Sequence, residues 1–99
     1  MSCSIDNYFN TLATAEYRMG SYQEAIQAAL KSVELSSQAF PGDYAILAMS
    51  YSKLGDPENA KDYRERFHKS MQLSAFRNDN TCKSFEAEVE RTFESIRKP

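Results

Sequence analysis

His68 is the only histidine in the chain, so it is the first residue to consider for a metal site or general base. A metal site needs further Cys, His, Asp or Glu ligands at suitable spacing. None stands at such a spacing from His68, and we interpret it as a solvated surface side chain. Cys3 and Cys82 lie far apart and match no metal or redox spacing. We expect two reduced, unconnected thiols.

Paired carboxylates are a second source of chemistry, because two of them on one face can act as acid and base. Glu86 and Glu90 share a helix face, but they stand among other charged residues that we expect to face solvent. The chain contains no glycine-rich phosphate loop and no nucleophile elbow. We therefore predict no catalytic, cofactor-binding or metal-binding residues, and we expect a protein that is not an enzyme.

A basic group in the second half could form a nucleic-acid surface. Its alternation with Asp62 and Glu65 instead indicates a solvated helix face. The net charge of the chain is −2, which argues against a strong attraction to nucleic acid or to an anionic membrane. The basic residues are Lys61, Arg64, Arg66, Lys69 and Arg77.

The bulk composition indicates one small folded domain. Of the 99 residues, 41% are hydrophobic and 12% aromatic, which is enough apolar surface for a core. The sequence shows no signal peptide and no apolar run long enough to span a membrane, so we expect a cytoplasmic location.

Apolar residues recur at spacings of three and four throughout, and alternating β-branched stretches are absent. This pattern predicts an all-α fold. Gly20 and Gly55 are placed where a helix ends, and Asp56 with Pro57 is typical of a helix start. The predicted helices cover about residues 8–17, 22–38, 43–54, 57–73 and 80–97.

The chain repeats itself at an offset of 35 residues, which is the mark of a repeat architecture. The types that match are an aromatic, a leucine, a small residue, a turn glycine and a second small residue. Small residues at these positions would allow two antiparallel helices to approach closely. The matching pairs are Phe9 and Tyr44, Leu12 and Leu47, Ala13 and Ala48, Gly20 and Gly55, and Ala25 and Ala60.

This pattern resembles the tetratricopeptide repeat (TPR) family, whose unit is a helical hairpin of about 34 residues. The second unit also has the family's second aromatic, Tyr51, whereas the first has Glu16 there, with Tyr17 beside it. The family's closing proline is replaced by Ser37 and Gln72. The resemblance implies a TPR-like α-α superhelix with units at residues 6–40 and 41–74 and a capping helix at 80–97. That last helix is expected to cover the exposed apolar face of the fourth helix.

The resemblance also implies a function in protein-protein interaction, with a protein or peptide segment bound in a concave groove along the first helix of each unit. The chaperone-binding variant of the family clamps a carboxylate with lysines and asparagines; Ala45 and Met49 stand at two of those positions, so we do not assign that specificity. The predicted groove residues are Asn7, Asn10, Thr14, Tyr17, Arg18, Ala45, Met49, Ser52 and Lys53.

Two repeats are fewer than the three that such arrays usually need to bury a continuous core. We therefore expect the chain to be part of a longer protein, or to be covered by a second copy. A structural scaffold or self-association segment is the alternative to a peptide-binding module. Nothing in the sequence identifies the partner.

Overall fold

A computed structural model describes residues 3–35, 41–72 and 80–97 of the chain. The described residues form helices and no strands, which confirms the predicted all-α fold. The helices are α1 (Cys3–Arg18), α2 (Tyr22–Leu35), α3 (Pro41–Lys53), α4 (Pro57–Met71) and α6 (Asn80–Arg97).

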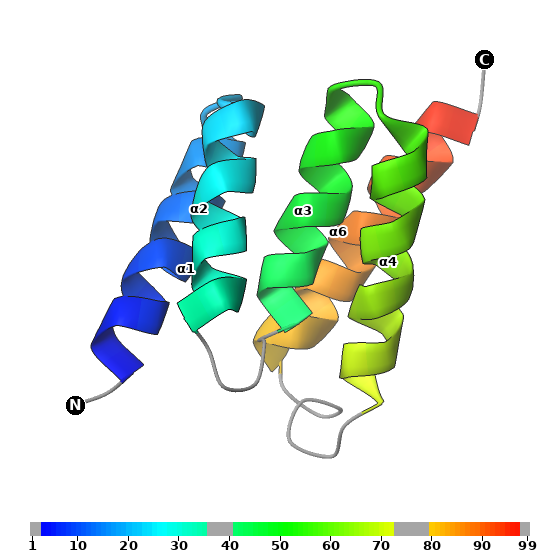
Figure 1. The fold of residues 1–99 in the computed structure, drawn as a ribbon. Coiled ribbons are helices and arrows are strands. Elements are labelled where there is room, and N and C mark those ends of the chain that lie inside the picture. Colours follow the sequence, from blue (N-terminus) through cyan, green and yellow to red (C-terminus); the bar gives the residue numbers. More distant parts are fainter. Residues whose placement is uncertain (1–2, 36–40, 73–79, 98–99) are drawn as a thin grey trace.

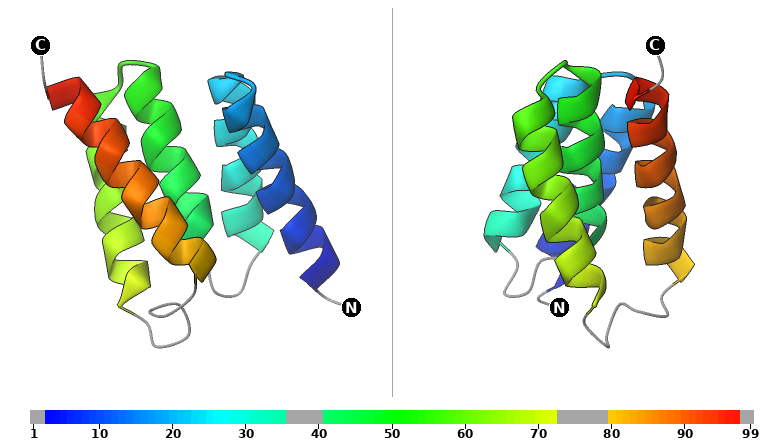
Figure 2. Two further views of the ribbon diagram at one scale, coloured as in Figure 1. Left: turned by 180° about the vertical axis from the view of Figure 1, so that it is seen from behind. Right: turned by 90° about the vertical axis from the view of Figure 1, so that its right-hand side faces the viewer.

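The helices form two antiparallel hairpins, α1 with α2 and α3 with α4, which stand side by side (Figure 1). The hairpins meet mainly where α2 packs against α3. Helix α6 runs obliquely across the back of the second hairpin, on the side of the molecule where α1 also lies (Figure 2). The first helix of each hairpin and α6 therefore share one side.

Each hairpin turn is built around a glycine in the left-handed conformation. Gly20 has φ +84° and Gly55 has φ +80°. In both turns the glycine N–H and the next N–H bond back to carbonyls of the preceding helix, as in a Schellman motif. Asp56 then caps α4, because its carboxylate accepts a hydrogen bond from the Asn59 backbone N–H at 3.3 Å. The predicted roles of Gly55, Asp56 and Pro57 are confirmed.

We predict that Gly55→Val destabilises the fold by about 1–2 kcal/mol, because a left-handed backbone forces Cβ toward the following carbonyl. A Cβ at Gly55 would meet no other atom within 4 Å, so the cost arises from the backbone conformation alone. Urea unfolding measures the change. Gly55→Asn is the control and should lose less, since asparagine tolerates this conformation better; equal losses would contradict the explanation.

The core lies between the two hairpins and under α6. Leu47 and Phe67 are fully buried, and α6 adds Val89. The repeated small residues are buried as well: Ala13, Ala25, Ala48 and Ala60 are at most 1% exposed. Their burial fits the predicted role of small side chains in bringing the paired helices close together.

Three expectations about the helices need correction. The first helix was expected from about residue 8, and α1 begins at Cys3. Helix α3 was expected from Asp43 and begins at Pro41, because a proline is compatible with the first helical turn, where its missing N–H costs nothing. The last helix was expected to cover α4, yet α6 packs chiefly on α3. The expected ends of the second and fourth helices, Gln38 and Leu73, lie outside the described residues, as do the side chains of Cys3 and Cys82.

A buried carboxylate joins three helices at the junction of the hairpins. Asp43, in the first turn of α3, is 0% exposed. Its Oδ1 accepts a hydrogen bond from Asn10 Nδ2 of α1 at 2.6 Å, and its Oδ2 accepts one from Ser32 Oγ of α2 at 2.9 Å. The N-terminal turn of a helix also favours a negative charge. Asp43 therefore ties the start of the second hairpin to both helices of the first.

We predict that Asp43→Ala lowers the free energy of unfolding by about 3 kcal/mol, because it removes two hydrogen bonds to a buried charged group, each worth about 1.5–3 kcal/mol. Thermal and urea unfolding measure the loss. Asp62→Ala is the matched control, since Asp62 is an exposed carboxylate on α4. A loss no larger than that of the control would show that the buried junction contributes little.

Candidate functional site

The predicted peptide-binding groove lies along α1 and α3, on the side of the molecule that these helices share with α6. Helix α6 covers part of that side (Figure 2). Ala45 and Met49 of α3 are both 0% exposed. They present no surface to a ligand in this conformation, so the accessible lining is smaller than expected. Helix α3 packs against α1, α2, α4 and α6, and periodicity within one helix does not show which of its side chains such neighbours bury.

The predicted residues of α1 mostly make contacts within the chain. Asn10 donates to Asp43, and the Thr14 hydroxyl donates to the Asn10 carbonyl at 3.0 Å. Tyr17 is 8% exposed, and burial raises the pKa of its hydroxyl above the ordinary value, while a hydrogen bond with Thr92 acts in the opposite direction. The side chain of Asn7 lies outside the described part of the structure.

Arg18 ties α1 to α6 through a bidentate ion pair with Glu88. Nη1 donates to Oε2, and Nη2 donates to Oε1 at 3.0 Å. Its hydrogen bond with Glu88 raises the pKa of Arg18 above the ordinary value. Arg18 is thus a candidate groove residue whose charge is already paired within the chain.

A second polar cluster holds α6 to α4, and sequence reasoning missed it. Glu90 accepts from Arg64, and its Oε2 lies 3.0 Å from His68 Nε2. The Arg64 guanidinium also lies over the Phe93 ring, with 4.8 Å between Cζ and the centroid. His68 was interpreted as a surface side chain without a partner at useful spacing. Glu90 is 22 residues away in sequence, so no local signal could have found this contact.

A cleft of about 340 Å³ lies on this side, beside the C-terminal end of α3. Lys53 from α3 and three residues of α6, Glu88, Arg91 and Thr92, line it. Lys53 and Arg91 are exposed, and neither forms an ion pair with a described residue. Ser52, the remaining predicted groove residue, is half-buried next to Lys53. The cleft thus combines two uncompensated cations with a carboxylate that Arg18 already neutralises.

Comparison with protein families agrees with the hairpin geometry. The family described as Tetratricopeptide repeat matches residues 7–38 and 44–66, which is more than half of the chain and falls on the two hairpins. The chain belongs to the tetratricopeptide repeat family. Comparison with curated proteins and with solved structures returned no match.

Repeats of this family generally mediate protein-protein interaction, and they are typically non-catalytic. In this tetratricopeptide protein, no three His, Cys, Asp or Glu side chains among the described residues are grouped so that they could hold a metal ion. Within residues 3–35, 41–72 and 80–97, no helix is both long enough and apolar enough to cross a bilayer.

The attachment of α6 to the repeats should weaken in acid. Hydrogen bonding from Arg64 is the main reason that the pKa of Glu90 lies below its ordinary value of 4.5, and His68 acts in the same direction. Because the folded state favours the carboxylate, the stabilisation is complete above the unfolded pKa and is lost as the pH falls through the lowered folded pKa.

We therefore expect the free energy of unfolding to fall less steeply below pH 4.5 in Glu90→Gln than in the wild type. Urea titrations at a series of pH values measure the slope. Glu94→Gln, which changes an exposed carboxylate of the same helix, is the control and should keep the wild-type slope. Identical slopes in the wild type and Glu90→Gln would show that Glu90 does not link stability to pH.

Proposed function

We propose that the protein is a non-catalytic interaction module that binds an acidic peptide segment of another protein in the cleft beside Lys53 and Arg91. The observation that carries the proposal is the pair of exposed cations in that cleft without a partner among the described residues. A carboxylate of a ligand would complete charge-assisted hydrogen bonds there. The family's general role in protein-protein interaction supports the same conclusion.

The residues that remain accessible in the cleft are polar. The original expectation included Ala45 and Met49, but both are buried, so the ligand would contact the remaining polar rim. Thr92 of α6 lies in the cleft, but its hydroxyl already donates to the Glu88 carbonyl at 2.9 Å. Recognition would therefore depend on charge more than on apolar burial. Such an interaction is weakened by salt.

The scaffold or self-association role remains the alternative, and the cytoplasmic location remains a prediction from the sequence. Binding of an acidic peptide would depend on the positive charges of the cleft, whereas packing of a second copy of the chain would not. A scaffold surface would tolerate reversal of the charges in the cleft, whereas a carboxylate-binding site would not.

We predict that Lys53→Glu with Arg91→Glu lowers affinity for acidic peptides by about tenfold or more, since two attractive charge pairs become repulsive. Fluorescence polarisation with a labelled oligo-glutamate peptide, at low and at physiological salt, measures the change. Retained helical circular dichroism and an unchanged melting temperature would show that the variant is folded.

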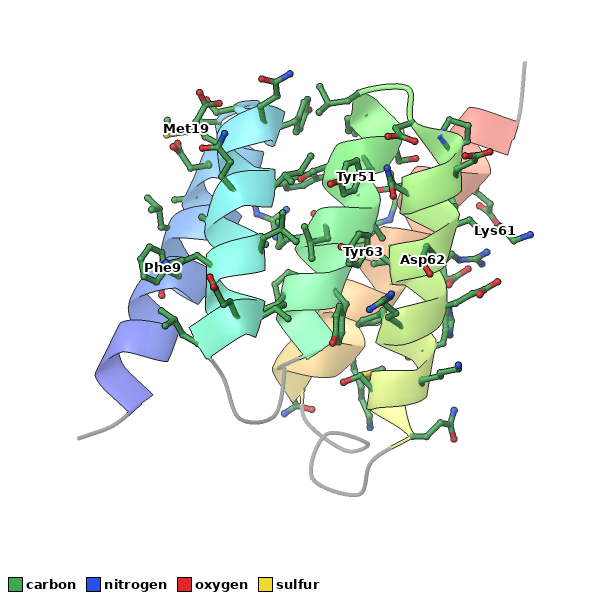
Figure 3. The ribbon with its side chains drawn as sticks, in the orientation of Figure 1. Phe9, Met19, Tyr51, Lys61, Asp62 and Tyr63 are labelled. Carbon is green, nitrogen blue, oxygen red and sulfur yellow. The ribbon has the colours of Figure 1, made fainter. Side chains whose placement is uncertain are left out.

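The matched control is Lys61→Glu, which makes the same type of charge reversal on α4. Figure 3 shows Lys61 projecting outward on the far side of α4 from the first hairpin. We expect this variant to bind nearly as the wild type does. No binding by the wild type at low salt, or equal losses in the control and the cleft variant, would refute a specific site at Lys53 and Arg91.

A further inference from the structure

A second depression lies away from the cleft, on the first hairpin. It has a volume of about 330 Å³ and is formed by α1 and α2. Leu12 and Ala28 line it together with Phe9, which projects from α1 at the outer edge of the molecule (Figure 3). We call this depression the hairpin groove. Its polar residues include Glu16, Glu24 and Lys31.

The charges along the hairpin groove are ordered. Glu16 stands near the end of α1 and Glu24 near the start of α2, so both carboxylates lie close to the Gly20 turn. Lys31 is seven residues after Glu24 on the same helix. Two helical turns, roughly 10 Å, therefore separate the acidic end from the basic end. Leu12 and Ala28 lie between these two ends. The Nζ of Lys31 lies 3.6 Å from Glu34 Oε1 in an exposed ion pair, a kind of contact that contributes little and that a ligand carboxylate can replace.

This groove differs from the opposite end of the domain. There α6 closes the end of the second hairpin, and its exposed residues outside the cleft include Lys83, Ser84 and Glu94. Terminal helices of a repeat array need such a polar outer face, because a repeat cannot bury its apolar face alone. A second copy stacked head to tail would offer the polar face of α6 to Leu12 and Ala28, which is a poor match. The groove instead fits a partner with its own apolar stripe.

The geometry points to the hairpin groove as a docking site for one amphipathic helix of a partner protein. The helix would carry an acidic residue at position i, apolar residues at i+3 and i+4, and a basic residue at i+7. The basic residue would lie beside Glu16 and Glu24, and the acidic one beside Lys31. This order of charges also suits a helix, which favours anions near its N-terminus and cations near its C-terminus. The site is independent of the cleft at Lys53.

Three synthetic helices of about 15 residues test the proposal, because shorter peptides are rarely helical in water. All share the two central leucines and differ only at i and i+7: one has Glu and Lys, one has Lys at both positions, and one has Glu at both. Isothermal titration calorimetry should show the mixed-charge peptide binding wild-type protein about fivefold more tightly than either of the others.

Lys31→Glu makes both ends of the hairpin groove acidic, and it changes a side chain that is 51% exposed. In this variant the preference should move to the peptide with two lysines. Lys61→Glu carries the same charge change outside the groove and should keep the wild-type order. The double variant Lys53→Glu with Arg91→Glu should also keep the wild-type order of peptide affinities. The test of the hairpin groove therefore remains valid even if the cleft does not bind acidic peptides.

Two outcomes would overturn the proposal. One is that the three peptides bind equally, or that none binds. The other is that sedimentation shows a dimer of the chain that Ala28→Arg disrupts, because the groove would then be an interface between two copies. Circular dichroism of Ala28→Arg confirms that it is folded, and if it is not, Lys31→Glu serves in its place.

Discussion

The buried carboxylate of Asp43 is the contact on which the relative placement of the two hairpins depends. A buried charge is costly unless it is hydrogen-bonded, and Asp43 accepts from Asn10 and Ser32 on two different helices. Apolar packing between helices tolerates small shifts, whereas these hydrogen bonds have narrow distance and angle limits. The junction therefore sets the geometry between α1, α2 and α3. Helix α6 packs on α3, one of the three helices that this junction joins.

Helix α6 determines which part of the concave side is accessible. Its apolar residues Phe85 and Val89 are buried, and its carboxylates reach outward to both hairpins. Glu88 pairs with Arg18 of α1, and Glu90 with Arg64 and His68 of α4. Helix α6 thus contacts α1, α3 and α4. The surface that remains open beside it is polar and basic, and the apolar groove on the first hairpin lies elsewhere. The domain has two separate surfaces with different chemical character.

Several features could be read from the sequence because each depends on residues close to one another in the chain. The 35-residue offset, the glycine turns and the capping aspartate predicted the hairpins. The role of Gly55 depends only on the left-handed conformation of its own backbone. The Asp56 carboxylate accepts a hydrogen bond from a backbone N–H only three residues later in the chain. The groove was harder to predict. Its residues were assigned from their place in each repeat, and for Ala45 and Met49 that assignment did not account for burial among the helices packed around α3.

The sequence by itself determined the helical hairpins, their turns and the membership of the family, since these follow from local backbone preferences and from apolar spacing within each helix. Only the tertiary structure decided which side chains a ligand could reach. The path of α6 depends on contacts between residues far apart in the chain, such as Arg18 with Glu88, which are 70 positions apart. Contacts of that kind depend on how the helices of the described residues pack together, and no spacing within one helix encodes them.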